Sequence, residues 1–246
     1  MIRFIVIVLY LVLYLILSLP VLFVEWIIGK FNPRLKAKSS MALVSWGFRC
    51  ITFLAGTKVI VKGRENIPAD TAVLYVGNHR SYFDIVLTCT LFPGVTGYVA
   101  KVEMRKAPIL SLWMKNIHCL FLDRGDIRKG LKTILAGVDE VKNGYSLCIF
   151  PEGTRNKVND TFLPFKEGSL KIAEKGGVPI VPLTLVNTAQ AFEDHLPKVK
   201  KTTVVIDFGL PIYPEQLDKD TRRNLGNYVF TRIKERYFAL KKEYFT

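Results

Sequence analysis

The chain is poor in the residue types that build disulfide frameworks, metal sites and acidic surfaces. Its 246 residues include 4 cysteines and 3 histidines, and 21 acidic residues stand against 35 lysines and arginines. No Cys-x-x-Cys pair occurs and no histidine stands at metal-ligand spacing, so the sequence predicts neither a metal site nor a redox centre. Each cysteine lies in an apolar run, which favours buried, reduced thiols in a cytosol-facing protein.

Other absences narrow the function further. The chain has no Gly-x-Ser-x-Gly elbow, which weighs against a lipid hydrolase. Cys119 and Cys148 have no charged neighbour in the sequence that would activate a thiol as a nucleophile. No internal repeat or low-complexity tract is present, and 246 residues suffice for one α/β domain with an appendage.

An excess of positive charge is combined with high hydrophobicity. The formal net charge is +14, 50% of the residues are hydrophobic and the mean hydropathy is positive. A chain that is both basic and apolar suggests an anionic membrane surface as its partner. Nucleic acid is not expected, because no recognition helix, zinc finger or aromatic stacking signature accompanies the charge.

The amino terminus carries the longest apolar run. Phe4 to Val24 spans 21 residues that only Ser18 and Pro20 interrupt, and as one helix it would be ~32 Å long, about the thickness of a bilayer's hydrocarbon core. A signal peptide is disfavoured because the run is too long and lacks a small-x-small cleavage site. Pro20 leaves open whether the segment spans the bilayer or forms a re-entrant element. A basic cluster follows and should keep the rest of the protein on the cytoplasmic side: Lys30, Arg34, Lys36 and Lys38.

A second apolar segment, Met41 to Leu54, has Ser40 as its expected N-cap and Gly56 as its expected C-cap. Arg49 lies in its middle, which suits a helix in the membrane interface better than one that crosses the bilayer. Residues 1–55 are therefore predicted to form two membrane-associated helices, and residues 56–246 a separate domain.

From Lys58 onward, short apolar runs alternate with helical patterns. This alternation predicts an α/β domain with a mixed, mostly parallel sheet flanked by helices. The expected strands are Val59–Val61, Ala72–Val76, Gly97–Ala100, Cys119–Leu122, Leu147–Phe150, Ile180–Val186 and Val204–Phe208. The expected helices are Phe83–Leu91, Pro108–Lys115, Ile127–Lys142, Lys166–Lys175 and Thr221–Tyr244, of which the last has an apolar stripe that should cover the sheet.

The segment Asn-His-Arg-Ser-Tyr-Phe-Asp, residues 78–84, follows one expected strand and leads into a helix. His79 is suited to take a proton from an alcohol near neutral pH, provided that a partner fixes its tautomer and stabilises the imidazolium. Asp84 is the expected partner. An alternative needs no catalysis: Ser81 caps the helix and Asp84 only interacts with its positive end.

A second segment, Phe-Pro-Glu-Gly-Thr-Arg, residues 150–155, follows another buried strand and should emerge at the same edge of the sheet. Gly153 allows the backbone to approach a ligand, and Arg155 offers a charged fork suited to phosphate. Glu152 would bind a hydroxyl of the substrate or hold an arginine. Lys101 and Arg124 also stand at strand ends, so the three cations are predicted to form one anion pocket.

These segments resemble the motifs of the glycerolipid acyltransferase superfamily, most closely those of the 1-acylglycerol-3-phosphate (lysophosphatidic acid) acyltransferases. The resemblance covers about residues 57–210, and the family often has glycine just before the second motif, where this chain has His118. The motifs that carry it are His79 to Asp84, which matches the family's His-x4-Asp, then Phe121-Leu122-Asp123-Arg124, Phe150 to Arg155, Pro164 to Gly168, and Val178 to Leu183.

The resemblance implies an acyltransferase of phospholipid biosynthesis that makes phosphatidic acid from lysophosphatidic acid. His79 would be the general base and Asp84 its orienting partner. The phosphate of the acceptor would be held by Arg124, Arg155 and Lys101, in a pocket shaped by Gly153 and Thr154. An acyl-CoA or acyl carrier protein thioester would supply the acyl group, and no metal or prosthetic group is expected.

Three alternatives stay open. In the first, the same chemistry serves another lysophospholipid, a glycolipid or an acylated amino acid as acceptor. A non-catalytic lipid-binding or tethering protein would keep the fold without the reaction. A thioesterase or lipid hydrolase would use the same base on water.

Overall fold

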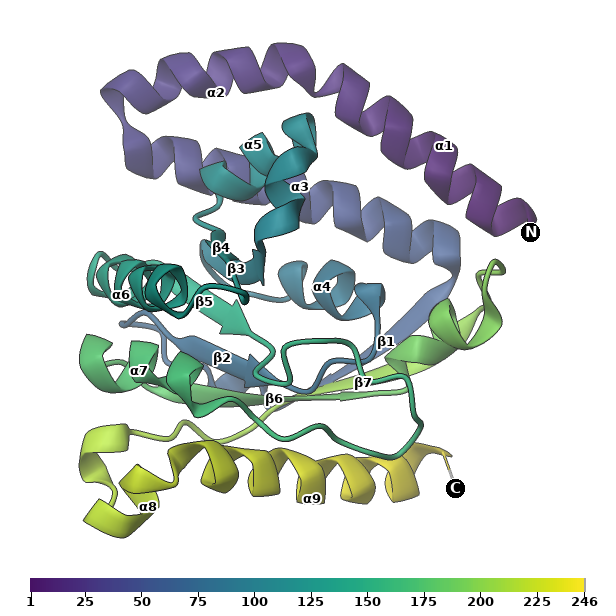
Figure 1. The fold of residues 1–246 in the computed structure, drawn as a ribbon. Helices are drawn as coiled ribbons and strands as arrows, with labels where there is room; N and C mark the ends of the chain where they lie inside the picture. Colours follow the sequence, from purple (N-terminus) through teal and green to yellow (C-terminus); the bar gives the residue numbers. More distant parts are fainter. Residues whose placement is uncertain (246) are drawn as a thin grey trace.

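Figure 1 shows three N-terminal helices stacked over one face of a single β-sheet, with the long C-terminal helix under the other face. This computed structural model describes residues 1–245, so of the predicted domain 56–246 only Thr246 lies outside the described residues. The N-terminal helices are α1 (Ile2–Leu17), α2 (Leu19–Phe31) and α3 (Pro33–Ala55), and the C-terminal helix is α9 (Leu225–Phe245).

The sheet has seven strands in the order β1-β7-β6-β2-β5-β3-β4. The strands are β1 (Thr57–Lys62), β2 (Leu74–Gly77), β3 (Thr96–Lys101), β4 (Leu120–Leu122), β5 (Ser146–Ile149), β6 (Ile180–Val186) and β7 (Thr202–Phe208). From β6 to β4 every neighbouring pair is parallel, whereas β7 runs antiparallel to β6 and parallel to β1. The predicted mixed, mostly parallel sheet is confirmed. Its parallel strands end at one common edge, which is where ligands bind in open α/β sheets.

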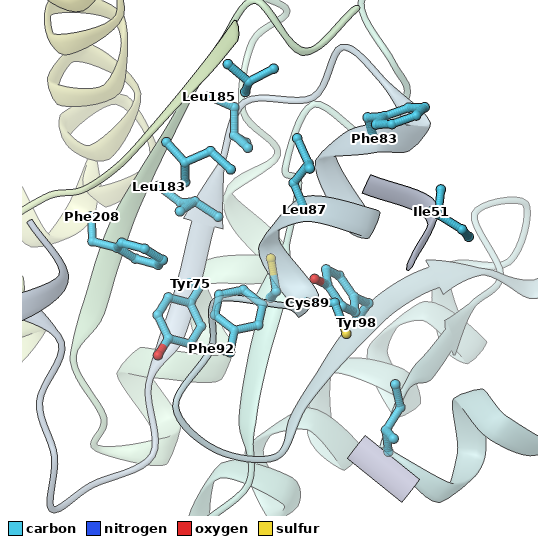
Figure 2. Close-up of a cluster of buried hydrophobic side chains, with 14 of the residues drawn as sticks. Ile51, Tyr75, Phe83, Leu87, Cys89, Phe92, Tyr98, Leu183, Leu185 and Phe208 are labelled. Carbon is cyan, nitrogen blue, oxygen red and sulfur yellow. The ribbon is translucent and has the colours of Figure 1, made fainter. Parts of the chain in front are cut away.

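Strand β2 lies at the centre, and its side chains alternate between two cores. Tyr75, like Val73 just before the strand, belongs to the core under α3 and α4 (Tyr82–Cys89), whereas Leu74 and Val76 belong to the core on the opposite face. Figure 2 shows the first core, in which Tyr75 lies beside Phe92 and Phe208. Burial on both faces explains why the parallel strands appear in the sequence as continuous apolar runs.

Three further helices and the C-terminal pair complete the layers. α5 (Pro108–Asn116) lies near the N-terminal helices, and α6 (Ile127–Lys142) and α7 (Lys171–Gly176) cover the sheet (Figure 1). The short helix α8 (Lys219–Arg223) precedes α9. The predicted apolar stripe of α9 is buried against the sheet at every position: Leu225, Val229, Ile233, Tyr237 and Leu240.

The first apolar run forms two helices rather than one. α1 ends at Leu17 and α2 begins at Leu19, with a bend of 45° between them. Pro20 in the first turn of α2 has no N–H to continue the helical hydrogen bonds of α1. At the break the buried Ser18 hydroxyl accepts a hydrogen bond from Trp113 Nε1 at 2.9 Å. Within residues 1–245 no single helix is long and apolar enough to cross a membrane, whereas the bent pair α1–α2 meets that test by length and composition.

The next helix, α3, begins earlier than the sequence predicts. Asn32, not Ser40, is its N-cap, and the Asn32 side chain accepts a hydrogen bond from the Leu35 N–H at 2.9 Å. Pro33 follows as the first helical residue, a position where its missing N–H costs nothing. The predicted C-cap is confirmed, since Gly56 has a left-handed backbone with φ of 69°.

Candidate active site

The site begins where β2 leaves the sheet. Asn78 is buried, and its side-chain amide pairs with the backbone of Leu185 on β6: Nδ2 donates to the carbonyl oxygen and Oδ1 accepts from the N–H, both at 2.9 Å. These two bonds imitate one more rung of the β2–β6 ladder. Asn78 therefore fixes the point at which the chain turns and His79 emerges.

His79 and Asp84 meet as the sequence predicts. His79 Nδ1 lies 2.7 Å from Asp84 Oδ2, and the same oxygen accepts hydrogen bonds from the N–H groups of Arg80 at 2.7 Å and Ser81 at 2.8 Å. An oxygen that already accepts from two N–H groups fits an ionised carboxylate, which in turn requires the proton of the neutral imidazole to sit on Nδ1. The Nε2 lone pair is then available to accept a proton from a substrate.

Asp84 also serves the helix that carries it. The Ser81 hydroxyl accepts from the Phe83 N–H at 2.9 Å, and Asp84 at the third helical position accepts from the Ser81 N–H, which completes a capping box. The capping role and the pairing with His79 were alternatives in the sequence, and the structure contains both. One fully buried carboxylate thus fixes the start of α4 and the orientation of the histidine.

The second segment is bound to the first through Glu152. This buried side chain accepts hydrogen bonds from two backbone N–H groups, His79 at 2.8 Å to Oε1 and Leu163 at 3.1 Å to Oε2. Burial raises the pKa of Glu152 from its usual range, while the two N–H donors act against that rise. Each oxygen of Glu152 thus accepts from a backbone N–H group, and one of these groups belongs to His79. That Glu152 binds a substrate hydroxyl or an arginine stays a prediction.

Two further contacts join the segments. The backbone carbonyl of His79 accepts from the Asn156 N–H at 2.8 Å. The imidazole of His79 stacks on the ring of Phe150, with centroids 4.3 Å apart and planes 13° from parallel. The imidazole ring therefore has little freedom to rotate. Phe150 stacks on one face, Asp84 binds Nδ1, and hydrogen bonds hold the backbone N–H and carbonyl of His79.

Gly153 occupies a backbone conformation that other residues rarely adopt, with φ of 75°. We expect Gly153→Ala to lower the free energy of unfolding by about 1 kcal/mol, because the added Cβ is strained in the left-handed region. The turn that carries Thr154 and Arg155 should shift, and the KM for the acceptor should rise. Denaturant titration and steady-state kinetics measure the two effects.

Gly144→Ala is the matched control for this substitution. Gly144 has φ of 87° and open space around its Cβ position, and it lies in the turn before β5, at the opposite end of that strand from the site. It should lose similar stability without any change in KM. An equal rise of KM in both variants would show that the glycine acts through stability alone.

Arg155 reaches the N-terminus of α4 instead of open solvent. Its guanidinium lies over the ring of Tyr82, 3.6 Å from the centroid, and its Nη1 is 3.2 Å from Glu193 Oε1. Stacking and the ion pair hold the guanidinium beside the His79 turn. Thr154 next to it is exposed.

Lys101 and Arg124 lie at the same sheet edge but farther along it. Lys101 is the last residue of β3 and Arg124 follows β4, and both are exposed. These strands are the first and second beyond β5, or about 5 and 10 Å from it at the usual strand spacing. Partial desolvation lowers the pKa of Arg124 from its usual value, and Glu103 acts against that shift. That all three cations share one anion pocket stays a prediction.

His118 explains one departure from the family's sequence pattern. Its backbone is left-handed, with φ of 61°, a conformation that glycine adopts without strain. The side chain makes up for part of the strain: Nδ1 lies 2.7 Å from Glu140 Oε2, and the ring stacks on Tyr145 with centroids 3.6 Å apart. The histidine therefore keeps the turn that a glycine would form there.

The sequence interpretation missed several side chains around the site. Arg80 is nearly buried and donates to the Asn156 carbonyl at 3.0 Å and to Asn159 Oδ1, and it lies 3.5 Å from Asp194 Oδ1. Lys166 places its ammonium close to Gly153. Lys166 lies in the motif Pro164 to Gly168, one of those that carry the resemblance, whereas nothing in the sequence indicated Glu193 or Asp194.

The cysteine thiols take no part in this arrangement. Cys89, Cys119 and Cys148 are buried, and Cys50 is half-buried. Burial raises the pKa of Cys89 and of Cys119 to about 12 and also raises that of Cys148. A thiol with so high a pKa stays protonated at neutral pH and is a poor nucleophile.

Comparisons with known proteins agree with this geometry. The model of the acyltransferase family matches residues 58–186. A probable 1-acyl-sn-glycerol-3-phosphate acyltransferase of Mycoplasma pneumoniae is 31% identical over 87% of this chain and 82% of its own length. The 1-acyl-sn-glycerol-3-phosphate acyltransferase of Borreliella burgdorferi is 34% identical over 65% of this chain and 61% of its own length.

The fold agrees as well. The crystal structure of the 1-acyl-sn-glycerophosphate acyltransferase from Thermotoga maritima superposes with a TM-score of 0.79, covers 98% of both chains and is 24% identical in sequence. The family model spans the described strands β1 to β6 and includes both segments of the site. The chain therefore belongs to the acyltransferase family, in its group of 1-acyl-sn-glycerol-3-phosphate acyltransferases.

Proposed function

We propose that this protein transfers a fatty acyl group from a thioester donor to the free hydroxyl of lysophosphatidic acid and so makes phosphatidic acid. The observation that carries the proposal is the 2.7 Å contact between His79 and Asp84 beside the guanidinium of Arg155. A base for an alcohol and a cation for a phosphate thus lie close together, on two turns that follow β2 and β5. The names of the relatives from Mycoplasma pneumoniae and Borreliella burgdorferi support the same acceptor.

The reaction needs one base and no covalent enzyme intermediate. His79 Nε2 takes the proton of the acceptor hydroxyl while the oxygen attacks the thioester carbonyl carbon, and a C–O bond forms. Asp84 stabilises the imidazolium that results. The tetrahedral intermediate then expels the thiolate as the C–S bond breaks, and the proton on Nε2 passes to the leaving sulfur. The imidazole returns to its starting state.

The cations of the sheet edge serve the acceptor phosphate in this proposal. Arg155 lies against Tyr82, three residues after His79, and presents a planar fork that suits phosphate oxygens. Gly153 and Thr154 shape the turn beneath it. Lys101 and Arg124 lie farther along the edge. They extend the positive charge toward the donor, either the phosphate groups of coenzyme A or the acidic surface of an acyl carrier protein. No step requires a metal or a prosthetic group.

An acyl-transfer assay tests the proposal. Wild-type protein is incubated with oleoyl-CoA or an acyl carrier protein thioester and with several acceptors. Lysophosphatidic acid, lysophosphatidylcholine and lysophosphatidylglycerol are offered separately, and the lipid products are separated by mass. Phosphatidic acid should be the main product. Efficient acylation of one of the other acceptors alone would keep the mechanism and refute the assignment of the acceptor.

We also propose that the protein works at an anionic membrane surface, with its catalytic domain on the cytoplasmic side. The bent pair α1–α2 supports this, because many of its apolar side chains are exposed. Large contiguous apolar surfaces on a folded chain mark interaction sites, and a basic cluster lies directly after this one. Donor and acceptor lipids would then reach the site from the bilayer.

Replacing exposed apolar residues of the two helices should release the protein from membranes. Leu9, Leu13 and Phe23 are 63%, 56% and 62% exposed, so Leu9→Ser, Leu13→Ser and Phe23→Ser together should spare the fold. Partitioning onto vesicles with anionic lipid should fall about 100-fold or more, because each side chain loses its transfer into the apolar layer. Vesicle sedimentation gives the bound fraction.

A control triple variant has the same kind of substitution, an exposed apolar residue to serine, on other parts of the surface. Ile127, Leu131 and Leu210 are 91%, 56% and 71% exposed and lie on α6 and after β7. Ile127→Ser, Leu131→Ser and Leu210→Ser together should leave partitioning unchanged. Equal release of both triple variants would contradict a membrane contact through α1 and α2.

A further inference from the structure

A carboxylate from a distant part of the chain occupies the space beside Arg155. Glu193 lies in a short 3-10 turn after β6, far in the sequence from both segments of the site. Its Oε2 accepts from the Ser81 hydroxyl at 2.5 Å, and its Oε1 accepts from the Tyr82 N–H at 2.6 Å and lies 3.2 Å from Arg155 Nη1. Three donors thus surround one anion.

The donors around Glu193 are those that bind phosphate in proteins. Ser81 and Tyr82 stand at the N-terminus of α4. There the N–H groups have no partner within the helix, and the helix dipole favours negative charge. Arg155 adds a guanidinium that is fixed over the Tyr82 ring. The carboxylate is therefore a bound anion in a site built from a hydroxyl, an N–H and a guanidinium.

We propose that Glu193 occupies the position of the acceptor phosphate and determines which acceptors the enzyme uses. This inference rests on the proposed function, because it assigns the phosphate of the acceptor to this site. A phosphomonoester carries a charge of about −1.5 to −2 at pH 7 and three acceptor oxygens, so it exceeds a single carboxylate in charge and in hydrogen bonds. A phosphodiester carries a single negative charge and gains nothing by displacing Glu193.

The neighbours of Glu193 keep its backbone in place during such an exchange. Phe192 stacks on Phe4 of α1 with centroids 5.6 Å apart, and Asp194 lies 3.5 Å from Arg80. Both contacts hold the segment from either side of Glu193. Displacement therefore requires rotation of the Glu193 side chain, and a substitution there should change the charge at the site without moving the segment.

Glu193→Gln tests this proposal through selectivity. Glutamine keeps the shape and one oxygen, which can accept from the Tyr82 N–H, while its NH2 group takes the place of the oxygen that faces Ser81. Arg155 is left without its charged partner. The KM for lysophosphatidic acid should fall about fivefold, the size expected from losing one partly exposed ion pair. The ratio of kcat/KM for lysophosphatidic acid to that for lysophosphatidylglycerol should fall as well. A rise of KM would overturn the proposal, because it would give Glu193 a supporting role.

Glu174→Gln is the matched control. Glu174 is an ion-paired carboxylate of similar side-chain exposure, 20% against 15% for Glu193, and it bonds to Lys171 and Arg222 away from the site. It should change neither KM nor selectivity. In an Arg155→Ala background, Glu193→Gln should no longer change KM. An undiminished effect there would overturn the proposal that Glu193 and the acceptor phosphate compete for Arg155.

Binding of inorganic phosphate separates this inference from the proposed function. Calorimetry on the full chain should show tighter phosphate binding to Glu193→Gln than to wild type, whether or not acyl transfer to lysophosphatidic acid occurs. Equal or weaker binding to the variant would overturn the inference. Absence of phosphatidic acid formation by the wild type would refute the proposed function alone.

Discussion

His79→Ala should lower kcat for acyl transfer about 1000-fold and leave the KM of both substrates within a few-fold of wild type. A positioned general base contributes roughly 100- to 10,000-fold to a proton-transfer step. The carboxylates of Asp84, Glu152 and Glu193 beside this turn are already bound by hydrogen-bond donors. The loss falls on kcat because the base acts on the hydroxyl after binding. Initial rates over a range of donor and acceptor concentrations, with lysophosphatidic acid as acceptor, separate the two parameters.

His118→Asn serves as the control for the loss of a histidine. His118 lies before β4, and asparagine is one of the few residues that tolerate its left-handed backbone. This variant should keep kcat, although it loses the Glu140 contact and with it some stability. If His79→Ala retained more than about a tenth of the wild-type kcat, another group would have to act as the base.

Asp84→Asn should lower kcat by roughly 1000- to 10,000-fold and should also lower stability. An amide at this position presents an NH2 group or a neutral oxygen to three donors that now share one carboxylate oxygen. Loss of the orienting charge leaves the imidazole in the wrong tautomer or poorly stabilised as a cation, which in histidine–aspartate pairs costs about 10,000-fold. The weakened bonds to Arg80 and Ser81 should lower the free energy of unfolding by about 1–3 kcal/mol.

Two measurements separate the catalytic and the capping role of Asp84. Ser81→Ala removes the other half of the capping box and should cost stability of about 1 kcal/mol while keeping most of the catalytic effect of Asp84. Denaturant unfolding and kcat are therefore measured for both variants. Parallel losses of kcat in Ser81→Ala and Asp84→Asn would mean that Asp84 acts only by holding the start of α4.

The sequence predicted the strands better than the ends of the helices. All seven expected strands are present, because parallel strands buried on both faces stand out as continuous apolar runs. α3 starts at Pro33 because Asn32 caps it, and its first turns are polar and resemble a linker in the sequence. The break at Ser18 has a local signal in Pro20, whereas the hydrogen bond from Trp113 to Ser18 comes from a distant segment that no local pattern reveals.

The same division applies to the site. His79 and Asp84 were predictable because the short turn before α4 brings them together, and Gly153 because its backbone requirement is local. The role of Glu152 depends on which backbone groups the fold delivers to it, namely those of His79 and Leu163. Glu193 reaches the site from a segment with no recognisable motif. The resemblance to the acyltransferases is confirmed, while the roles of the individual site residues stay predictions.

Hydrogen bonds join the two segments of the site. This connection explains physically why the two motifs, residues 78–84 and 150–155, occur together. Glu152 receives the N–H of His79, and Asn156 donates its own N–H to the His79 carbonyl. The turn that carries the base and the turn that carries Arg155 are therefore one rigid unit. A base and a phosphate-binding cation held in this way can place the hydroxyl of a phosphorylated acceptor against the imidazole.

The most direct test of the central claim follows thiol release and phosphatidic acid formation together in the wild type. Vesicles that contain lysophosphatidic acid receive oleoyl-CoA, and both products are quantified over the first turnovers beside His79→Ala. We predict one phosphatidic acid for each thiol released, no thiol release without the acceptor, and neither product from the variant. Thiol release without lysophosphatidic acid, or phosphatidic acid formed at the wild-type rate by His79→Ala, would contradict direct transfer through this histidine.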